Sequence, residues 1–123
     1  MGKFVIKKAK TGFKFDLKAG NGEIIATSET YKSLPSCRKG LESVRKNSVA
    51  PIEDQTVDPV VKIRNPKFEL YVDKAGEYRF RLKARNGEII AVGEGYKAKP
   101  SALNGIQSIK KNAPDAPVVK EEA

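Results

Sequence analysis

The sequence predicts an α+β fold in which two tandem β-β-β-α-β repeats share one hydrophobic core. Three observations support this prediction: a repeat of about fifty-five residues, period-two alternation of apolar and polar residues early in each copy, and a helical apolar stripe later in each copy. The repeat is clearest where residues 21–26 and 86–91 both read Asn-Gly-Glu-Ile-Ile-Ala. A single copy would bury little apolar surface, so we expect one domain over residues 1–123. Its parts are repeat 1 at 1–55, a connector at 56–65, repeat 2 at 66–120 and a tail at 121–123.

Each copy is expected to begin with two half-buried antiparallel strands, because apolar side chains recur at every second position. The side chains that share the inward register are Phe4, Ile6, Phe13, Phe15 and Leu17 in the first copy and Phe68, Leu70, Tyr78, Phe80 and Leu82 in the second. Asn21-Gly22 and Asn86-Gly87 predict two-residue type I′ hairpins, since both residues tolerate positive φ. A third strand should follow at 23–28 and at 88–93, which completes a three-stranded meander.

A helix is predicted next in each copy, with Pro35 or Pro100 in its first turn. Its apolar stripe would cover the inward face of the sheet, and consists of Cys37, Leu41 and Val44 in the first copy and Ala102, Ile106 and Ile109 in the second. The mid-helix glycines Gly40 and Gly105 predict close approach of another backbone. Asn47 and Asn112 should end the helices as residues that tolerate the left-handed conformation. Pro-containing segments at 49–53 and 116–119 are then predicted to be short edge strands.

Charge and composition limit the class of function. The formal net charge is +9, from 24 Lys and Arg against 15 Asp and Glu, and both halves of the chain are basic. Such a charge favours anionic partners, among them nucleic acid. The single cysteine excludes an internal disulfide framework and fits a reducing compartment. Neither a signal peptide nor a membrane-spanning stretch is evident, so we expect a cytoplasmic protein without membrane contact.

The sequence holds no recognisable catalytic or metal-binding motif. Histidine is absent, and no paired cysteines, calcium loop or Gly-rich phosphate loop occur, so we expect no enzymatic activity, cofactor or metal site. Cys37 is the one candidate nucleophile. Its place near a helix N-terminus and beside Arg38 could lower its pKa, whereas its counterpart Ala102 indicates a small buried core residue. We favour the buried thiol.

The polar face of the predicted sheet is the first candidate binding site. Six basic side chains should point away from the helices, and one aromatic ring is placed to stack a base; these are Lys7, Lys14, Lys18, Arg79, Arg81 and Lys83, with Tyr71. Such a face could follow a phosphate backbone. Asp16, Glu23 and Glu69 interrupt the charge, and for the face itself we favour the interpretation that it is merely solvated.

The second candidate lies where the third strand leads into the helix. Tyr31-Lys32 and Tyr96-Lys97 recur there and could offer donors to an anion near a helix N-terminus. The alternative is structural: each tyrosine packs its ring under the helix while Glu29 or Glu94 pairs with a neighbouring lysine. We favour the structural interpretation.

The combined motif of Asn-Gly-Glu-Ile-Ile-Ala, Glu-x-Tyr-Lys and residues 105–113 resembles the YegP-like family of small bacterial tandem-repeat domains, whose function is uncharacterised. The resemblance covers both copies. It implies two β-β-β-α-β units that form one continuous, mostly antiparallel sheet with the last strand of each unit exchanged onto the other. It also implies that single-repeat relatives pair, so this duplicated chain should be a monomer with internal pseudo-two-fold symmetry. We expect a non-enzymatic module that binds an anionic macromolecule such as nucleic acid. The alternative is a protein-interaction or structural module, with a stress-related role as one form of it.

Overall fold

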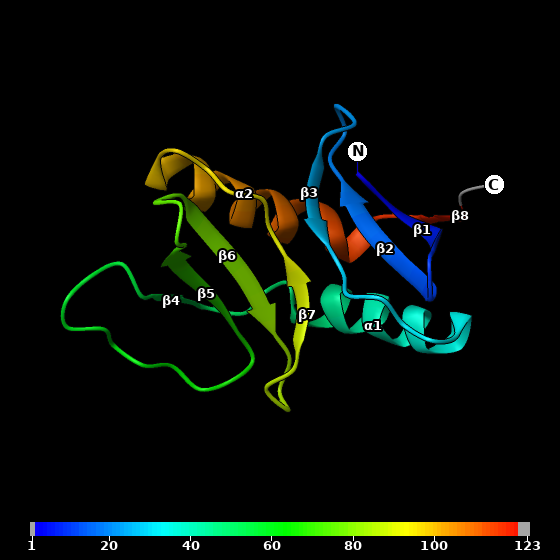
Figure 1. Ribbon diagram of the computed structural model, residues 1–123, viewed down its shortest axis with the longest axis horizontal. Coiled ribbons are helices and arrows are strands. Elements are labelled where there is room, and N and C mark those ends of the chain that lie inside the picture. Colours follow the sequence, from blue (N-terminus) through cyan, green and yellow to red (C-terminus); the bar gives the residue numbers. More distant parts are fainter. Residues whose placement is uncertain (1, 121–123) are drawn as a thin grey trace.

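One eight-stranded mixed sheet with both helices on one face forms the protein in the computed structural model, which describes residues 2–120 (Figure 1). The predicted tail at 121–123 lies outside these residues. The elements of the first repeat are β1 (Lys3–Ala9), β2 (Gly12–Lys18), β3 (Ile24–Thr27), α1 (Leu34–Asn47) and β4 (Ile52–Asp54). Those of the second are β5 (Lys67–Val72), β6 (Tyr78–Lys83), β7 (Ile89–Val92), α2 (Lys99–Asn112), a 3-10 turn (Ala113–Asp115) and β8 (Val118–Lys120). The predicted α+β class and tandem repeats are confirmed.

The last strand of each repeat pairs with the other repeat, as the family resemblance implies. The strand order is β4-β5-β6-β7-β3-β2-β1-β8, with β4 parallel to β5 and β8 parallel to β1. All other pairs are antiparallel. Each helix also reaches across the middle of the sheet, because α1 packs on β2 and β7 while α2 packs on β6 and β3. The two repeats therefore share one core.

Basic side chains near the helix C-termini hold the segments that lead into the exchanged strands. Arg45 of α1 donates from one guanidinium nitrogen to the carbonyl oxygens of Ala113, Pro114 and Ala116, at 3.3, 3.2 and 2.9 Å. Lys110 of α2 occupies the matching position. Its ammonium group donates to the carbonyl oxygen of Ala50 at 2.8 Å, just before β4. A cation at a helix C-terminus is also favoured by the helix dipole.

The core consists of the inward side chains that the alternation predicts. Phe4, Leu17, Phe68 and Leu82 are completely buried, as is the helical stripe that covers them. Burial of each such side chain contributes about 1.5–3 kcal/mol to stability. Phe13 and Tyr78, at the ends of the pattern, are only half-buried and pack against the edge of the core.

The hairpins between second and third strands differ from the predicted type I′ turns. Among the described residues, 2–120, none other than glycine has positive φ, while Gly22 and Gly87 have φ of 87° and 86°. Gly22 N donates to Ala19 O and Ala19 N donates to Glu23 O, which closes a three-residue loop with the glycine in the left-handed region. The Asn21 side chain accepts from Glu23 N at 3.0 Å, so asparagine serves as a local acceptor and does not adopt positive φ.

Two predictions about the helices are also corrected. The residues that follow α1 and α2, Ser48 and Ala113, are right-handed, so no left-handed residue ends either helix. Asn47 and Asn112 instead lie in the last turn and donate to the carbonyl oxygens of Ser43 and Ser108.

The mid-helix glycines face a tyrosine ring where another backbone was predicted. A β-carbon at Gly40 would collide with the Tyr31 hydroxyl, and one at Gly105 would lie 2.7 Å from the Tyr96 hydroxyl. Side-chain packing therefore explains why glycine occurs at this position in both repeats.

Candidate functional site

All seven residues predicted for the polar sheet face lie on one side of the sheet, opposite the helices. The strand register places Lys3 beside Lys18, Val5 beside Asp16 and Lys7 beside Lys14 in the first repeat. In the second repeat it places Lys67 beside Lys83, Glu69 beside Arg81 and Tyr71 beside Arg79. We call the side that carries these twelve residues the open face.

In the second repeat, acidic side chains neutralise most of the open face. Glu69 lies 2.6 Å from Arg81 and 3.4 Å from Lys83, measured between the charged atoms. Asp73 lies 2.7 Å from Arg79, and Glu53 of β4 lies 2.8 Å from Lys67. Burial of Glu69 opposes its ionisation, but the neighbouring cations outweigh burial and lower its pKa. These carboxylates are ionised at neutral pH, so the predicted row of Arg79, Arg81 and Lys83 carries little free charge.

Tyr71, the aromatic residue predicted to stack a base, already has a cationic neighbour. The Arg81 guanidinium lies over the Tyr71 ring at 4.6 Å from its centroid, a cation–π contact. A base could therefore stack on this side of the ring only by displacing Arg81, which Glu69 also holds.

In the first repeat, the cations of the open face are mostly free. Lys7 contacts Asp16 at 2.6 Å. Within residues 2–120, Lys3, Lys14 and Lys18 form no ion pair. The free positive charge of the open face is thus concentrated on β1 and β2.

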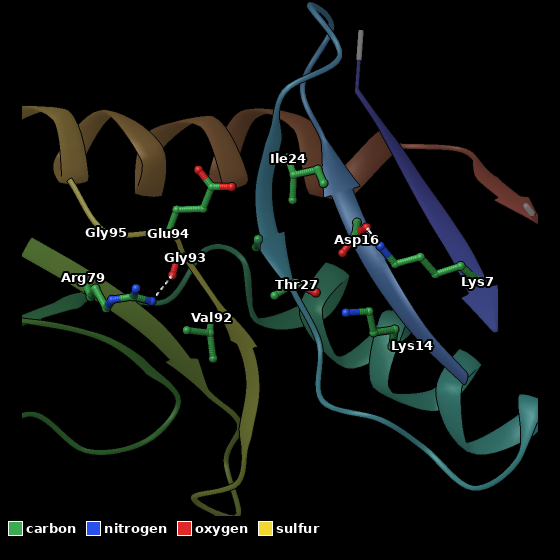
Figure 2. Close-up of a pocket in the computed structure, with 11 residues that line it drawn as sticks. Lys7, Lys14, Asp16, Ile24, Thr27, Arg79, Val92, Gly93, Glu94 and Gly95 are labelled. Atoms are coloured by element: carbon green, nitrogen blue, oxygen red, sulfur yellow. Dashed lines mark hydrogen bonds and ion pairs between the residues drawn. The ribbon is translucent and has the colours of Figure 1, made fainter. Parts of the chain in front are cut away.

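A hollow of about 340 Å³ lies on the open face where the two repeats meet (Figure 2). Within residues 2–120, β3 and β7 pair through one residue pair, Thr27 and Val92, and both residues line the hollow. One wall carries Lys7 and Lys14, and the opposite wall carries Arg79 and residues 93–95. Figure 2 shows Lys14 pointing toward the gap from the β2 side.

The sequence did not predict that Thr27, Val92 and Glu94 line the same hollow. Thr27 Oγ1 is buried and has no hydrogen-bond partner within residues 2–120. Glu94 is exposed. The repeat register could have indicated that the third strands are equivalent, but local periodicity does not reveal that they meet at the centre of the sheet.

The tyrosine of each Tyr-Lys pair packs its ring on a phenylalanine of its own repeat. The Tyr31 ring stacks on Phe15 with centroids 6.4 Å apart, and the Tyr96 ring stacks on Phe80 at 6.2 Å. Burial raises the pKa of both tyrosines. Lys32 and Lys97 are exposed and lie outside these packing contacts. The tyrosines therefore lie where the structural interpretation places them.

That interpretation also included an ion pair between Glu29 or Glu94 and a neighbouring lysine. Neither Glu29 nor Glu94 contacts a lysine or arginine charge anywhere in residues 2–120.

Cys37 is completely buried in the core beneath α1. Burial raises the pKa of its thiol, and the opposing effect of Arg38 is smaller. A protonated, inaccessible thiol is a poor nucleophile.

Across the described chain, His, Cys, Asp and Glu side chains do not gather in groups of three or more that could hold a metal ion. No helix within residues 2–120 has the length and apolarity to cross a membrane.

A family model and individual relatives both show similarity to one family of proteins over most of this chain. The family described as "Domain of unknown function (DUF1508)" matches twice, at residues 9–54 and 73–119. A UPF0339 protein of Pseudomonas aeruginosa is 42% identical over 115 residues, which cover 93% of this chain and 92% of the relative. The UPF0339 protein YegP of Yersinia pestis is 42% identical over 113 residues, 91% of this chain and 88% of the relative.

Solved structures and a shorter relative support the repeat architecture. The solution NMR structure of the E. coli protein yegP, described as of unknown function, matches with a TM-score of 0.78 and 36% identity over 98% of this chain and 92% of that one. A UPF0339 protein of Treponema denticola is 63% identical over 54 residues, which make up 93% of the relative and only 44% of this chain. The chain therefore belongs to the DUF1508/UPF0339 family of YegP-like proteins, whose function is unknown, and carries two copies of the family's repeat.

Proposed function

We propose that this protein is a non-enzymatic module that binds nucleic acid through the first-repeat half of the open face. The observation that carries the proposal is the unequal pairing of charge: Lys3, Lys14 and Lys18 have no acidic partner in residues 2–120, whereas Glu53, Glu69 and Asp73 pair with the cations of the second repeat. Unpaired lysines on one side of a sheet attract phosphates without first breaking an internal ion pair.

Binding of this kind depends on release of counterions from the phosphate backbone. Each phosphate neutralised on a single strand contributes a slope of about −0.7 to the dependence of log K on log salt. Since the described lysines of this half form a compact group on two adjacent strands, we expect contact with about three phosphates and a slope near −2. Exposed aromatic rings are lacking on this part of the face in residues 2–120, so phosphates should supply most of the affinity.

The test is fluorescence anisotropy with labelled single-stranded RNA, single-stranded DNA and duplex DNA at about 50 and 200 mM salt. The double variant Lys14→Glu/Lys18→Glu should lose about tenfold or more in affinity at the lower salt concentration. Lys39→Glu/Lys46→Glu makes the same change in net charge on exposed positions of α1, behind the sheet, and is the matched control. Equal losses in both variants, or none in the first, would contradict the proposal.

A protein-interaction or structural module is the second candidate, favoured by the sheet edges. The edge strand β8 exposes Val119 (41%), and the loop beside β4 exposes Val61 (75%). Contacts at such apolar positions would be insensitive to salt. Absence of nucleic-acid binding even at low salt would favour this second function.

A further inference from the structure

We infer that the hollow between β3 and β7 receives one unpaired nucleotide, with its phosphate at Lys14 and the amino edge of its base at Glu94. This inference rests on the proposed function and adds the place and the chemical form of recognition. The phosphate-binding lysines would hold the nucleic-acid strand, and the hollow would discriminate among the bases of that strand.

The hollow lies at the centre of the molecule's pseudo-symmetry. Lys14 of β2 and Arg79 of β6 occupy matching positions of the two repeats and line it from opposite sides. The two cations differ in availability, however. Asp73 holds Arg79 at 2.7 Å, and the same guanidinium makes a long contact of 3.5 Å to Gly93 O. Lys14 has no ion pair within the described residues, so an incoming anion should bind on the Lys14 side.

The opposite end of the hollow carries an acidic group. Glu94 follows β7 directly, is exposed, and forms no ion pair in the part of the chain that the structure describes. Figure 2 shows its side chain extending from the β7 side of the gap toward Ile24. A simple polyanion would be repelled here, because a like charge close to the ligand is unfavourable. The hollow therefore suits a ligand with an anion at one end and hydrogen-bond donors at the other.

Apolar and buried groups make up part of the remaining lining of the hollow. Ala26, Val92 and Ile24 line the hollow, and Thr27 Oγ1 lies buried in its wall without a partner in residues 2–120. A nucleotide carries groups that match these three kinds of surface: a phosphate for the lysine, the faces of a base for the apolar side chains and an amino group for the carboxylate. Carboxylates accept from the amino group of cytosine, and such pairings discriminate between bases. At about 340 Å³ the hollow is at the small end of the range for ligand pockets, which fits a single nucleotide and not a base pair.

The test compares short oligomers of cytidine and of uridine, which have bases of similar size. Cytosine carries an amino group where uracil carries a carbonyl oxygen, which Glu94 would repel. We expect the cytidine oligomer to bind about tenfold more tightly to the wild-type protein. Glu94→Ala should abolish this preference and leave the affinity for the uridine oligomer unchanged or slightly higher.

Glu29→Ala is the matched control, since Glu29 is the exposed counterpart of Glu94 in the first repeat and does not line the hollow. It should keep the cytidine preference. Amide NMR shifts on addition of the cytidine oligomer should include Thr27 and Val92. Equal, salt-dependent binding of both oligomers, with Glu94→Ala behaving like wild type, would overturn the inference and leave the proposed function intact. Binding of neither oligomer at low salt would overturn the proposed function and the inference together.

Discussion

Two residue positions account for most of the difference in ion pairing between the two halves of the open face. Glu53 and Glu69 lie side by side on β4 and β5, and the matching pair on β8 and β1 is Val119 and Val5. Carboxylates at these positions bring the neighbouring cations into ion pairs, whereas valines leave the lysines of the first repeat without acidic partners there. Similar backbones therefore present different electrostatic surfaces.

Glu53 should make the free energy of unfolding depend on pH in the acidic range. Hydrogen bonds from Lys67, from Gln55 and from the backbone N–H of Ile63 lower the pKa of Glu53 to about 2. A carboxyl with a lowered pKa stabilises the fold fully above its unfolded value of about 4.3, and this contribution is lost as the pH falls toward the folded value. We expect Glu53→Gln to lower the free energy of unfolding by about 2 kcal/mol at pH 7.

Urea denaturation at neutral pH and near pH 3 checks this expectation. The difference between wild type and Glu53→Gln should shrink at the lower pH, because near pH 3 the unfolded wild-type chain binds a proton at Glu53 that must be released on folding. A difference that stays constant with pH would show that the ionised form of Glu53 contributes nothing.

At the level of elements, the exchanged strands depend on contacts outside the sheet. Within residues 2–120, β8 comprises the three residues Val118–Lys120 and pairs with one neighbour, β1. Arg45 adds three hydrogen bonds to the segment that leads into β8 and lies over the Phe4 ring at 5.3 Å from its centroid. Lys110 lies over Phe68 at 5.6 Å in the other repeat. One cation per helix therefore fixes each crossing strand.

Arg45→Ala should loosen β8 selectively. Loss of the guanidinium leaves three carbonyl oxygens without this donor, and hydrogen bonds to charged groups contribute about 1.5–3 kcal/mol. Hydrogen exchange of the Phe4 amide is the measurement, since Phe4 N donates to Pro117 O at 2.8 Å beside β8. The amide should exchange faster in Arg45→Ala than in Arg38→Ala, which alters an exposed position of the same helix. Equal protection in the two variants would mean that Arg45 does not hold the strand.

At the scale of the whole molecule, the duplication supplies both partners of the strand exchange in one chain. β4 completes the sheet of the second repeat and β8 completes that of the first, while each helix spans the seam. Two repeats in one chain bring these surfaces together without the loss of translational freedom that association of separate chains entails.

We therefore predict a monomer in solution. Light scattering coupled to size exclusion should give a mass near the 13.5 kDa of the single chain. A mass of twice this value at micromolar concentration would indicate that strands are exchanged between chains.

Much of the fold could be predicted because it depends on local patterns. The alternation around Phe15 and Phe80 and the stripe from Cys37 to Val44 each identify their element and its buried face. The hairpins were predicted less well, since Asn-Gly is compatible with more than one turn and the Asn21 side-chain hydrogen bond selects the loop with a single left-handed glycine. The close approach at Gly40 was expected, but its partner, the Tyr31 ring, comes from a different element.

The sequence by itself determined the repeat, the α+β class, the core residues and the side of the sheet on which the candidate basic residues lie. These features follow from side-chain periodicity within short segments. Only the tertiary structure decided which of those cations are free, because Glu69 of β5 meets Arg81 and Lys83 of β6 only once the two strands pair in this register. The seam hollow likewise arises where β3 and β7 come together from opposite halves of the chain, and no local pattern encodes a contact between segments so far apart.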